Sequence, residues 1–167
     1  MAAAVTLVLP EWYEEKFVDV EGLFIDLFTA LLPAVDVGCW YADDWLDDPS
    51  PDPQLQFFRL PGARVDLGRN SDVCHVQALA VSDLRDDSWR LINFVRSIVL
   101  PMQGAKVRMS DGFTASVWCS DDVSGPQMLT PAQQIDNRVI PWVFSVRVGL
   151  RSRKRYDDVL AGLVSAS

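Results

Sequence analysis

Residues 71–101 read SDVCHVQALAVSDLRDDSWRLINFVRSIVLP, and this stretch indicates the fold class more clearly than any other. From residue 72 to 81 apolar and polar side chains alternate, which predicts a β-strand. One face of that strand carries small apolar side chains, which suit close packing by a helix. From residue 89 to 102 apolar side chains recur at helical spacing, so this segment is predicted to be that helix. Its buried stripe is expected to contain Leu91, Ile92, Val95, Ile98, Val99 and Met102.

The charges around this predicted helix agree with its direction. Asp83, Asp86 and Asp87 place negative charge near its N-terminus, where the helix dipole favours it. Pro101 and Gly104 are expected to end the helix. Three arginines lie off the apolar stripe and are expected to be solvated: Arg85, Arg90 and Arg96.

A second amphipathic helix is predicted earlier in the chain, over residues 20–32. Asp19 is a suitable N-cap for it, and Pro33 is expected to end it. Its apolar stripe includes Phe24 and Phe28. Two such large side chains need a broad surface, such as a sheet, to cover them.

The remaining predicted elements are mostly strands. They lie over residues 35–41, 54–60, 105–109, 114–120 and 138–150, and a short helix is expected over 156–164. The turn signal Pro61-Gly62 is expected to close the second of these strands. In the last strand the even-numbered positions form the apolar face, and Pro141 indicates a sheet edge or a bulge.

We expect one α+β domain over residues 19–167, preceded by an N-terminal arm over residues 1–18. Two extended loops are predicted within the domain. The first covers about residues 42–53, where prolines and like charges oppose regular pairing, and the second covers 121–137. A loop as long as the second is usually functional or ordered by a partner.

The N-terminal arm leaves two interpretations open. Residues 5–9 have the composition of a short strand. Trp12, Tyr13 and Phe17 are expected to dock the arm, either on this subunit or on a neighbour.

The net charge of −8 is unevenly distributed. Residues 1–60 carry twelve acidic against two basic side chains, a balance of −10, whereas residues 138–167 carry six basic against two acidic ones, a balance of +4. Such polarity is a plausible basis for head-to-tail contact between identical subunits. The alternative is that both regions are solvated faces. The acidic total argues against general nucleic-acid binding, which needs clustered Lys and Arg.

No catalytic, metal or cofactor motif stands out. The only histidine, His75, lies in the predicted strand over residues 72–81, where a half-buried position is expected. Cys39, Cys74 and Cys119 are too far apart for a zinc knuckle, and buried reduced thiols are expected for all three. Glycine-rich phosphate-binding loops, a membrane-spanning segment and a secretory signal are not found. We therefore expect a protein that is not an enzyme and has no cofactor.

Several segments together resemble the tail terminator proteins of long-tailed bacteriophages, particularly of phages that infect actinobacteria. The resemblance covers about residues 19–153. It is carried by the opening helix DVEGLFIDLFTALLP, the strand and turn QLQFFRLPGARVD, the strand and helix quoted above, and the late strand VIPWVFSVRVGLR.

This resemblance implies an α+β subunit with a mixed or mostly antiparallel sheet and the two main helices on one face. It also implies a homo-oligomeric ring, usually of six subunits, at the head-proximal end of the virion tail. Such a ring stops polymerisation of the tail tube protein and joins the tube to the head-to-tail connector, or stopper, protein. DNA passes through its lumen without specific binding, and the protein is made in the cytoplasm of the bacterial host.

Two groups of residues are candidates for the contacts of such a ring. The acidic group, with Trp45 as its apolar anchor, contains Asp43, Asp44, Trp45, Asp47 and Asp48. The basic group contains Arg147, Arg151, Arg153 and Arg155. The alternative is that all are solvated surface residues. The four aspartates also invite a metal-site interpretation, but their spacing does not match an EF-hand loop.

Two other functions remain open. A head-completion or stopper protein shares small α+β subunits and ring assembly, and differs in its layer of the connector. A small soluble ligand-binding domain or enzyme would instead need a concave pocket with convergent polar groups.

Overall fold

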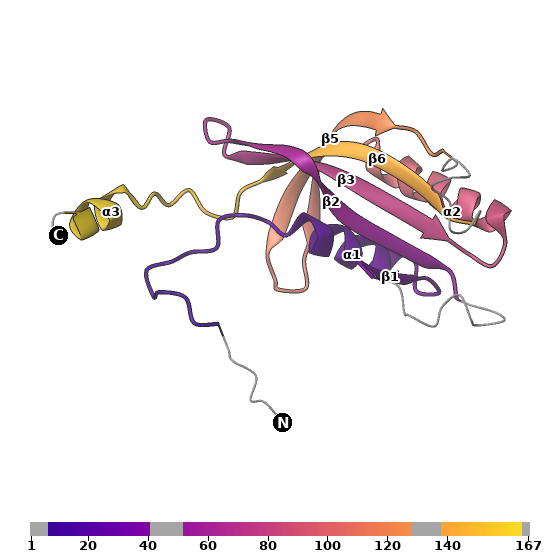
Figure 1. The fold of residues 1–167 in the computed structure, drawn as a ribbon, viewed down its shortest axis with the longest axis horizontal. Helices are drawn as coiled ribbons and strands as arrows, with labels where there is room; N and C mark the ends of the chain where they lie inside the picture. The colour runs from indigo at the N-terminus through magenta and orange to yellow at the C-terminus, as the bar shows by residue number, and fades with distance from the viewer. Residues whose placement is uncertain (1–6, 41–51, 128–137, 165–167) are drawn as a thin grey trace, which may run out of the picture.

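The computed structural model describes residues 7–40, 52–127 and 138–164. These residues form a curled sheet with two helices packed on it and a third helix near the C-terminus (Figure 1). In chain order the elements are α1 (Val20–Leu31), β1 (Asp36–Gly38), β2 (Gln54–Asp66), β3 (Ser71–Val81), α2 (Arg85–Val99), β4 (Gln103–Arg108), β5 (Thr114–Ser124), β6 (Ile140–Gly149) and α3 (Asp157–Val164).

The strands of the described residues are ordered β1-β2-β3-β6-β5-β4. Only β1 and β2 run parallel, and the other neighbouring pairs are antiparallel. The sheet is therefore mixed and mostly antiparallel. This confirms the α+β class expected from the sequence.

Both main helices cover the same face of the sheet. The ring of Phe24 in α1 stacks on Phe57 of β2 at 5.4 Å and meets Phe144 of β6 edge-on at 5.3 Å. Helix α2 contributes the buried side chains of Ile92 and Val95 to the same core. Since α1 contacts β1, β2 and β4, which lie towards opposite edges of the sheet, the sheet must curl around that helix (Figure 1).

Local chemistry sets the helix ends. The Asp19 side chain accepts a hydrogen bond from the amide of Glu21 at 3.1 Å, so Asp19 is the predicted N-cap of α1. Helix α2 begins at Arg85, one turn earlier than the predicted start at residue 89. That first turn is polar and shows no apolar periodicity. It is held by Ser88, whose hydroxyl accepts a hydrogen bond from the Ser82 amide at 2.9 Å.

Strand β2 does not end at residue 60, as the Pro61-Gly62 signal had predicted. It continues to Asp66, and its pairing with β3 shifts register between Leu60 and Arg64. Gly62 lies in this irregularity with φ at +101°, a conformation that favours glycine. Residues 61–63 of β2 lie opposite the single residue Cys74 of β3, so the signal marks a β-bulge rather than a turn, since extra residues can bend a strand without ending it.

The predicted loop over residues 121–137 begins later than expected, because β5 extends to Ser124. The Asp122 carboxylate accepts a hydrogen bond from the indole N–H of Trp142 at 2.8 Å and forms an ion pair with Arg96 of α2. Arg96, which was expected to be solvated, is thus paired, and its guanidinium lies 5.8 Å from the Trp142 ring centroid. Residues 128–137 of this loop lie outside the described residues.

Strand β6 has the predicted apolar face, since its even-numbered residues from Ile140 to Val148 are buried. β6 as a whole is an interior strand between β3 and β5, but at Pro141 it pairs only with β3, so the expected sheet edge is found locally at that residue. Pro141 is the second residue of the strand and precedes Val143, the first β6 residue that pairs with β5. A proline is tolerated there because few ladder hydrogen bonds are lost so close to the strand end.

The cysteines were expected to be buried, which is correct for Cys74 and wrong for Cys39. Cys74 lies in the core, where burial raises the pKa of its thiol to about 12. Cys119 is half-buried. Cys39 follows the short strand β1 and is exposed, because only three residues of that strand pair with the sheet.

Candidate assembly surfaces

Both ends of the described chain leave the body of the protein together. We call residues 7–17 with residues 151–164 the terminal extension (Figure 1). The Arg151 amide donates to the Lys16 carbonyl at 3.0 Å, and the Lys16 ammonium donates to the Lys154 carbonyl at 2.9 Å. Further out, the Tyr156 hydroxyl accepts from the Glu14 amide at 2.9 Å and lies 3.0 Å from the Glu14 carbonyl. Segments about 140 residues apart in sequence therefore hold each other outside the sheet.

Aromatic and ionic contacts reinforce this pairing. The ring of Tyr156 meets Trp12 edge-on at 5.3 Å and stacks with Tyr13 at 6.3 Å. Hydrogen bonds from Ser152 and then Lys154 lower the pKa of the Glu14 carboxyl. Of the two interpretations of the arm, docking on its own subunit is the one observed for Trp12 and Tyr13. Residues 7–9 are not in a strand, and residues 5 and 6 lie outside the described residues.

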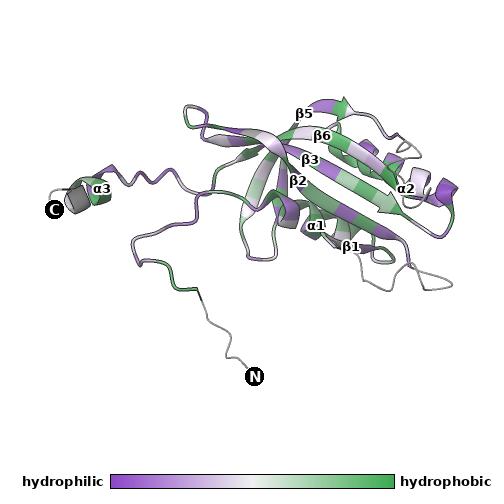
Figure 2. Cartoon of the chain, in the orientation of Figure 1, coloured by the Kyte–Doolittle hydropathy of each residue, from purple (hydrophilic) through white to green (hydrophobic). Residues whose placement is uncertain are grey.

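The terminal extension exposes apolar side chains. Leu7 is 80% exposed, Val8 is 85% exposed and Leu160 of α3 is 59% exposed. Figure 2 shows the apolar colouring at the described start of the arm and on α3, far from the core. Exposed apolar side chains on a projecting segment are typical of a surface that another chain covers.

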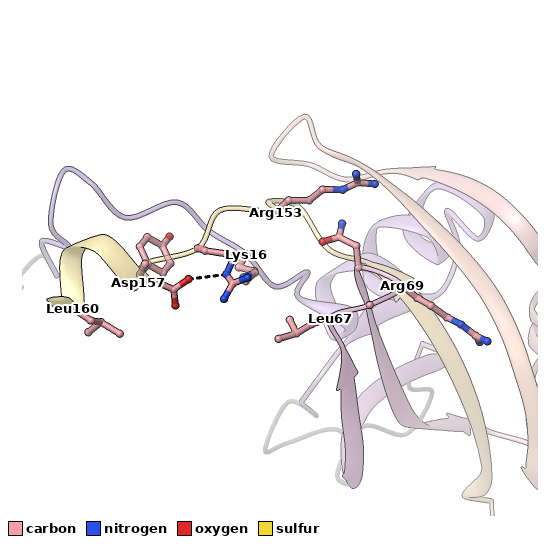
Figure 3. A pocket seen from close by; sticks show the side chains of 10 residues that line it. Lys16, Leu67, Arg69, Arg153, Asp157 and Leu160 are labelled. Atoms are coloured by element: carbon pink, nitrogen blue, oxygen red, sulfur yellow. Dashed lines mark ion pairs between the residues drawn. The ribbon is translucent and has the colours of Figure 1, made fainter.

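An open hollow of about 620 Å³ separates the terminal extension from the turn between β2 and β3 (Figure 3). We call it the basic cleft. Four cations line it: Lys16, Arg69, Arg153 and Arg155. Leu67 lies on the turn side and Leu160 on the α3 side. In Figure 3 the guanidinium groups of Arg69 and Arg153 point away from α3.

A second hollow of about 380 Å³ adjoins the basic cleft and shares Arg69 and Asn70 with it. Arg147 and Trp118 also line it, on neighbouring strands β6 and β5. Arg147 is half-buried and lies on the sheet face opposite the core, as the strand alternation predicts. The two hollows form one continuous basic surface at this end of the sheet.

The structure thus brings together three of the four predicted basic residues, Arg147, Arg153 and Arg155, and separates the fourth. Arg151 is only 17% exposed and forms an ion pair with Asp111 in the β4–β5 turn. Its guanidinium also lies 4.6 Å from the Phe113 ring centroid. The backbone amide of Phe113 and then Arg151 lower the pKa of the Asp111 carboxyl. Arg151 therefore stabilises its own subunit.

The predicted acidic group, Asp43, Asp44, Trp45, Asp47 and Asp48, lies outside the described residues. Its flanks are described. The Asp36 amide donates to the Pro53 carbonyl at 2.8 Å, and β1 pairs with the first residues of β2. Trp40 is exposed just before the segment. The described flanks therefore meet at one end of β2, and the basic cleft lies at the other end.

Within the described ranges, no group of three or more His, Cys, Asp or Glu side chains lies close enough to hold a metal ion. His75 is half-buried in β3, as expected, and is paired in register with Leu60 and Ser145. Among the described helices, none is long and apolar enough to cross a membrane.

Sequence reasoning missed several residues of the basic cleft, notably Lys16, Arg69 and Tyr156. They belong to the arm, the β2–β3 turn and the C-terminal segment, none of which shows a periodic pattern. Only the local excess of positive charge near the C-terminus indicated part of this surface.

A comparison with protein-family models matches residues 16–155 to a family described as phage tail termination protein. The chain belongs to this family. The match spans most of the chain, including the whole sheet, α1 and α2. A comparison with curated proteins gives no significant match.

As a phage tail termination protein, this chain is a structural component of the virion tail. Membership of the family implies interaction with tail components and with components of the head connector. The resemblance stated from the sequence is thereby confirmed at the level of the family.

Proposed function

We propose that copies of this protein assemble head-to-tail into a closed ring, expected to contain six subunits, on the head-proximal end of a siphovirus-type tail tube. The ring stops addition of tube protein and presents the surface to which the connector or stopper protein attaches. DNA passes through its lumen without specific binding. The role is structural and needs neither catalysis nor a cofactor.

The observation that carries this proposal is the separation of charge along the sheet. The basic cleft lies where β2 meets β3 through the turn, and β1 and the start of β2, which flank the four aspartates in sequence, pair at the opposite end of β2. A ring uses a heterologous interface, in which two different patches of the same subunit meet. Opposite charges at opposite ends make two such patches complementary to each other.

The terminal extension gives the proposal further support. It projects from the body and exposes Leu7, Val8 and Leu160. A structural protein with several partners needs such surfaces in addition to the contact between subunits. The extension is therefore assigned to contact with a neighbouring copy, the tube or the connector.

A tube-growth assay tests the proposal. Tail tubes are incubated with the protein, and labelled tube protein is then added. Capped tubes are expected to stop growing at one end and to accept connector-bearing heads there. A stopper protein would bind heads and leave growth of bare tubes unchanged. Tubes that grow equally from both ends after incubation, with no protein bound to either, would overturn the proposal.

A further inference from the structure

The basic cleft combines two kinds of side chain that rarely line one hollow. Lys16, Arg69, Arg153 and Arg155 bring four positive charges, against one negative charge from Asp157. Leu67 and Leu160, both well exposed, face the same hollow. A ligand that pairs with the four cations and also covers the two leucines must be acidic and must carry a bulky apolar group.

The chain itself contains such a segment. Residues 42–48 read ADDWLDD, so an adjacent tryptophan and leucine are flanked on each side by two aspartates. The four aspartates match the four cations of the cleft in number. Trp45 and Leu46 supply the apolar group that the two exposed leucines would cover.

The segment is too short to reach the basic cleft of its own subunit. Gly38 pairs with Gln56 of β2, and Gln56 and Asp66 pair with Leu79 and Ser71 of β3, which are eight residues apart and span roughly 26 Å of strand. The basic cleft lies beyond Asp66, at the turn and α3. Trp45 is seven residues after Gly38, and seven residues span at most roughly 25 Å when fully extended. The segment must also return to the start of β2, which restricts its reach further.

We infer that the basic cleft of each subunit binds residues 42–48 of a second copy of this chain, with Trp45 between Leu67 and Leu160. This inference rests on the proposed ring and names its subunit contact. Repetition of one contact from copy to copy closes the ring without a second type of interface.

Duplex DNA is the other polyanion that a phage protein meets. A DNA backbone matches the four cations but offers no apolar group for the exposed leucines. The exposed carboxylate of Asp157, which forms an ion pair with Arg155 at 2.7 Å, would also repel phosphates. The acidic and apolar protein segment therefore fits the cleft better.

Photocrosslinking of the full-length protein on tail tubes tests this contact. A photoreactive phenylalanine analogue replaces Trp45, and equal amounts of nitrogen-14 and nitrogen-15 protein are mixed before irradiation. Crosslinked peptides are expected to join a light and a heavy chain, from residue 45 to residues 67–70 or 153–160. The same analogue at Leu84, an exposed position at the acidic end of the sheet, is expected to miss the cleft. The inference would be overturned if residue 45 crosslinked within its own chain, to tube protein or to the connector. It would also be overturned if residue 45 formed no crosslink.

Charge reversal gives a second, independent readout. Arg69→Glu with Arg153→Glu is expected to raise the concentration needed for ring formation by roughly tenfold or more. Adding Asp44→Lys and Asp47→Lys to the same chain is expected to recover most of that loss. The matched control, Arg90→Glu with Arg108→Glu, makes the same charge change at exposed positions away from the cleft.

The outcomes separate this inference from the proposed function. If the cleft variant forms rings on tubes as readily as the unaltered protein, the inference is wrong, whereas the proposed terminator function is still supported. A cleft variant that assembles normally but no longer retains a DNA duplex would assign the cleft to nucleic acid instead. If the unaltered protein forms no ring on tubes, the proposed function fails along with the contact.

Discussion

The contact between Asp122 and Trp142 gives the sharpest test of the subunit structure. Asp122 lies in a segment whose sequence predicts a loop, yet its carboxylate accepts the indole N–H of the buried Trp142 at 2.8 Å and pairs with Arg96 of α2. The change Asp122→Ala removes both contacts at once. It should therefore loosen the end of β5 from α2 and β6.

The expected loss of stability follows from the two contacts. A buried donor left without a partner costs about 1–3 kcal/mol, and partial access of water to this site favours the lower half of that range. The ion pair is about one-third exposed at both ends, so it adds only about 0.2–1 kcal/mol. Asp122→Ala should thus destabilise the protein by about 2 kcal/mol, which lowers Tm by roughly 4–8 °C in a chain of this size.

Two variants serve as controls in urea unfolding. Asp122→Asn keeps an oxygen for the Trp142 N–H and loses the charge, so about half the effect is expected. Asp121→Ala makes the same truncation at the exposed neighbouring residue and should change the free energy of unfolding by less than about 0.5 kcal/mol. Equal effects at positions 121 and 122 would mean that the contacts of Asp122 with Trp142 and Arg96 do not stabilise the protein.

The same contact predicts a pH dependence. The hydrogen bond from Trp142, followed by Arg96, lowers the pKa of the Asp122 carboxyl in the folded protein. A lowered folded pKa stabilises the protein above the unfolded pKa of about 3.9, and this contribution is lost as the pH falls through the folded value. The stability difference between the unaltered protein and Asp122→Ala should therefore shrink below about pH 4.

The remaining predictions concern assembly, reactivity and the terminal extension. Arg147→Glu should weaken ring formation in native mass spectrometry with Tm unchanged, whereas Arg151→Glu should lower Tm because it places a carboxylate beside Asp111. Cys39 should react rapidly with a maleimide, and Cys74, whose thiol pKa is raised to about 12 by burial, should react only on unfolding. Tyr156→Phe removes the hydroxyl bonded to the Glu14 backbone and should speed exchange of that amide about fivefold.

Each of these predictions has an opposite outcome. Equal loss of Tm at positions 147 and 151 would contradict the separate roles of the two arginines. Rapid labelling of Cys74 in the folded state would contradict its place in the core. Unchanged exchange at Glu14 would mean that the two ends of the chain do not pair in solution.

The sequence predicts well those elements whose patterns depend on burial alone. The stripes of α1 and α2 and the alternation of β3 and β6 arise because one face of each element is covered. Hydrophobic periodicity reports that directly. Most apolar positions of these elements therefore lie in the core as expected, including Phe24, Phe28 and the even-numbered residues of β6. Leu91 and Ile98 of the predicted α2 stripe are only half-buried against that core.

Errors arise where a local signal has more than one structural outcome. Pro61-Gly62 is compatible with a turn or with a bulge, and the pairing of β2 with β3 decides for the bulge. The end of β5 depends on the partners of Asp122, which are distant in sequence. Arg151 lies in a basic run, and only the fold shows that Asp111 faces it.

The candidate site was predicted only in part. Charged residues can be counted in the sequence, but the sequence does not show which of them the fold brings close together. The positive charge near the C-terminus indicated Arg153 and Arg155. Lys16 and Arg69 join them only because the chain ends pair and the β2–β3 turn lies alongside. Such contacts leave no periodic trace in the sequence.

The most direct test of the central claim is native mass spectrometry of the purified protein over a wide concentration range, with and without tail tubes. We expect a closed ring of identical subunits, either in solution or bound to tube ends. A protein that stays monomeric at every concentration and ignores the tubes would contradict it.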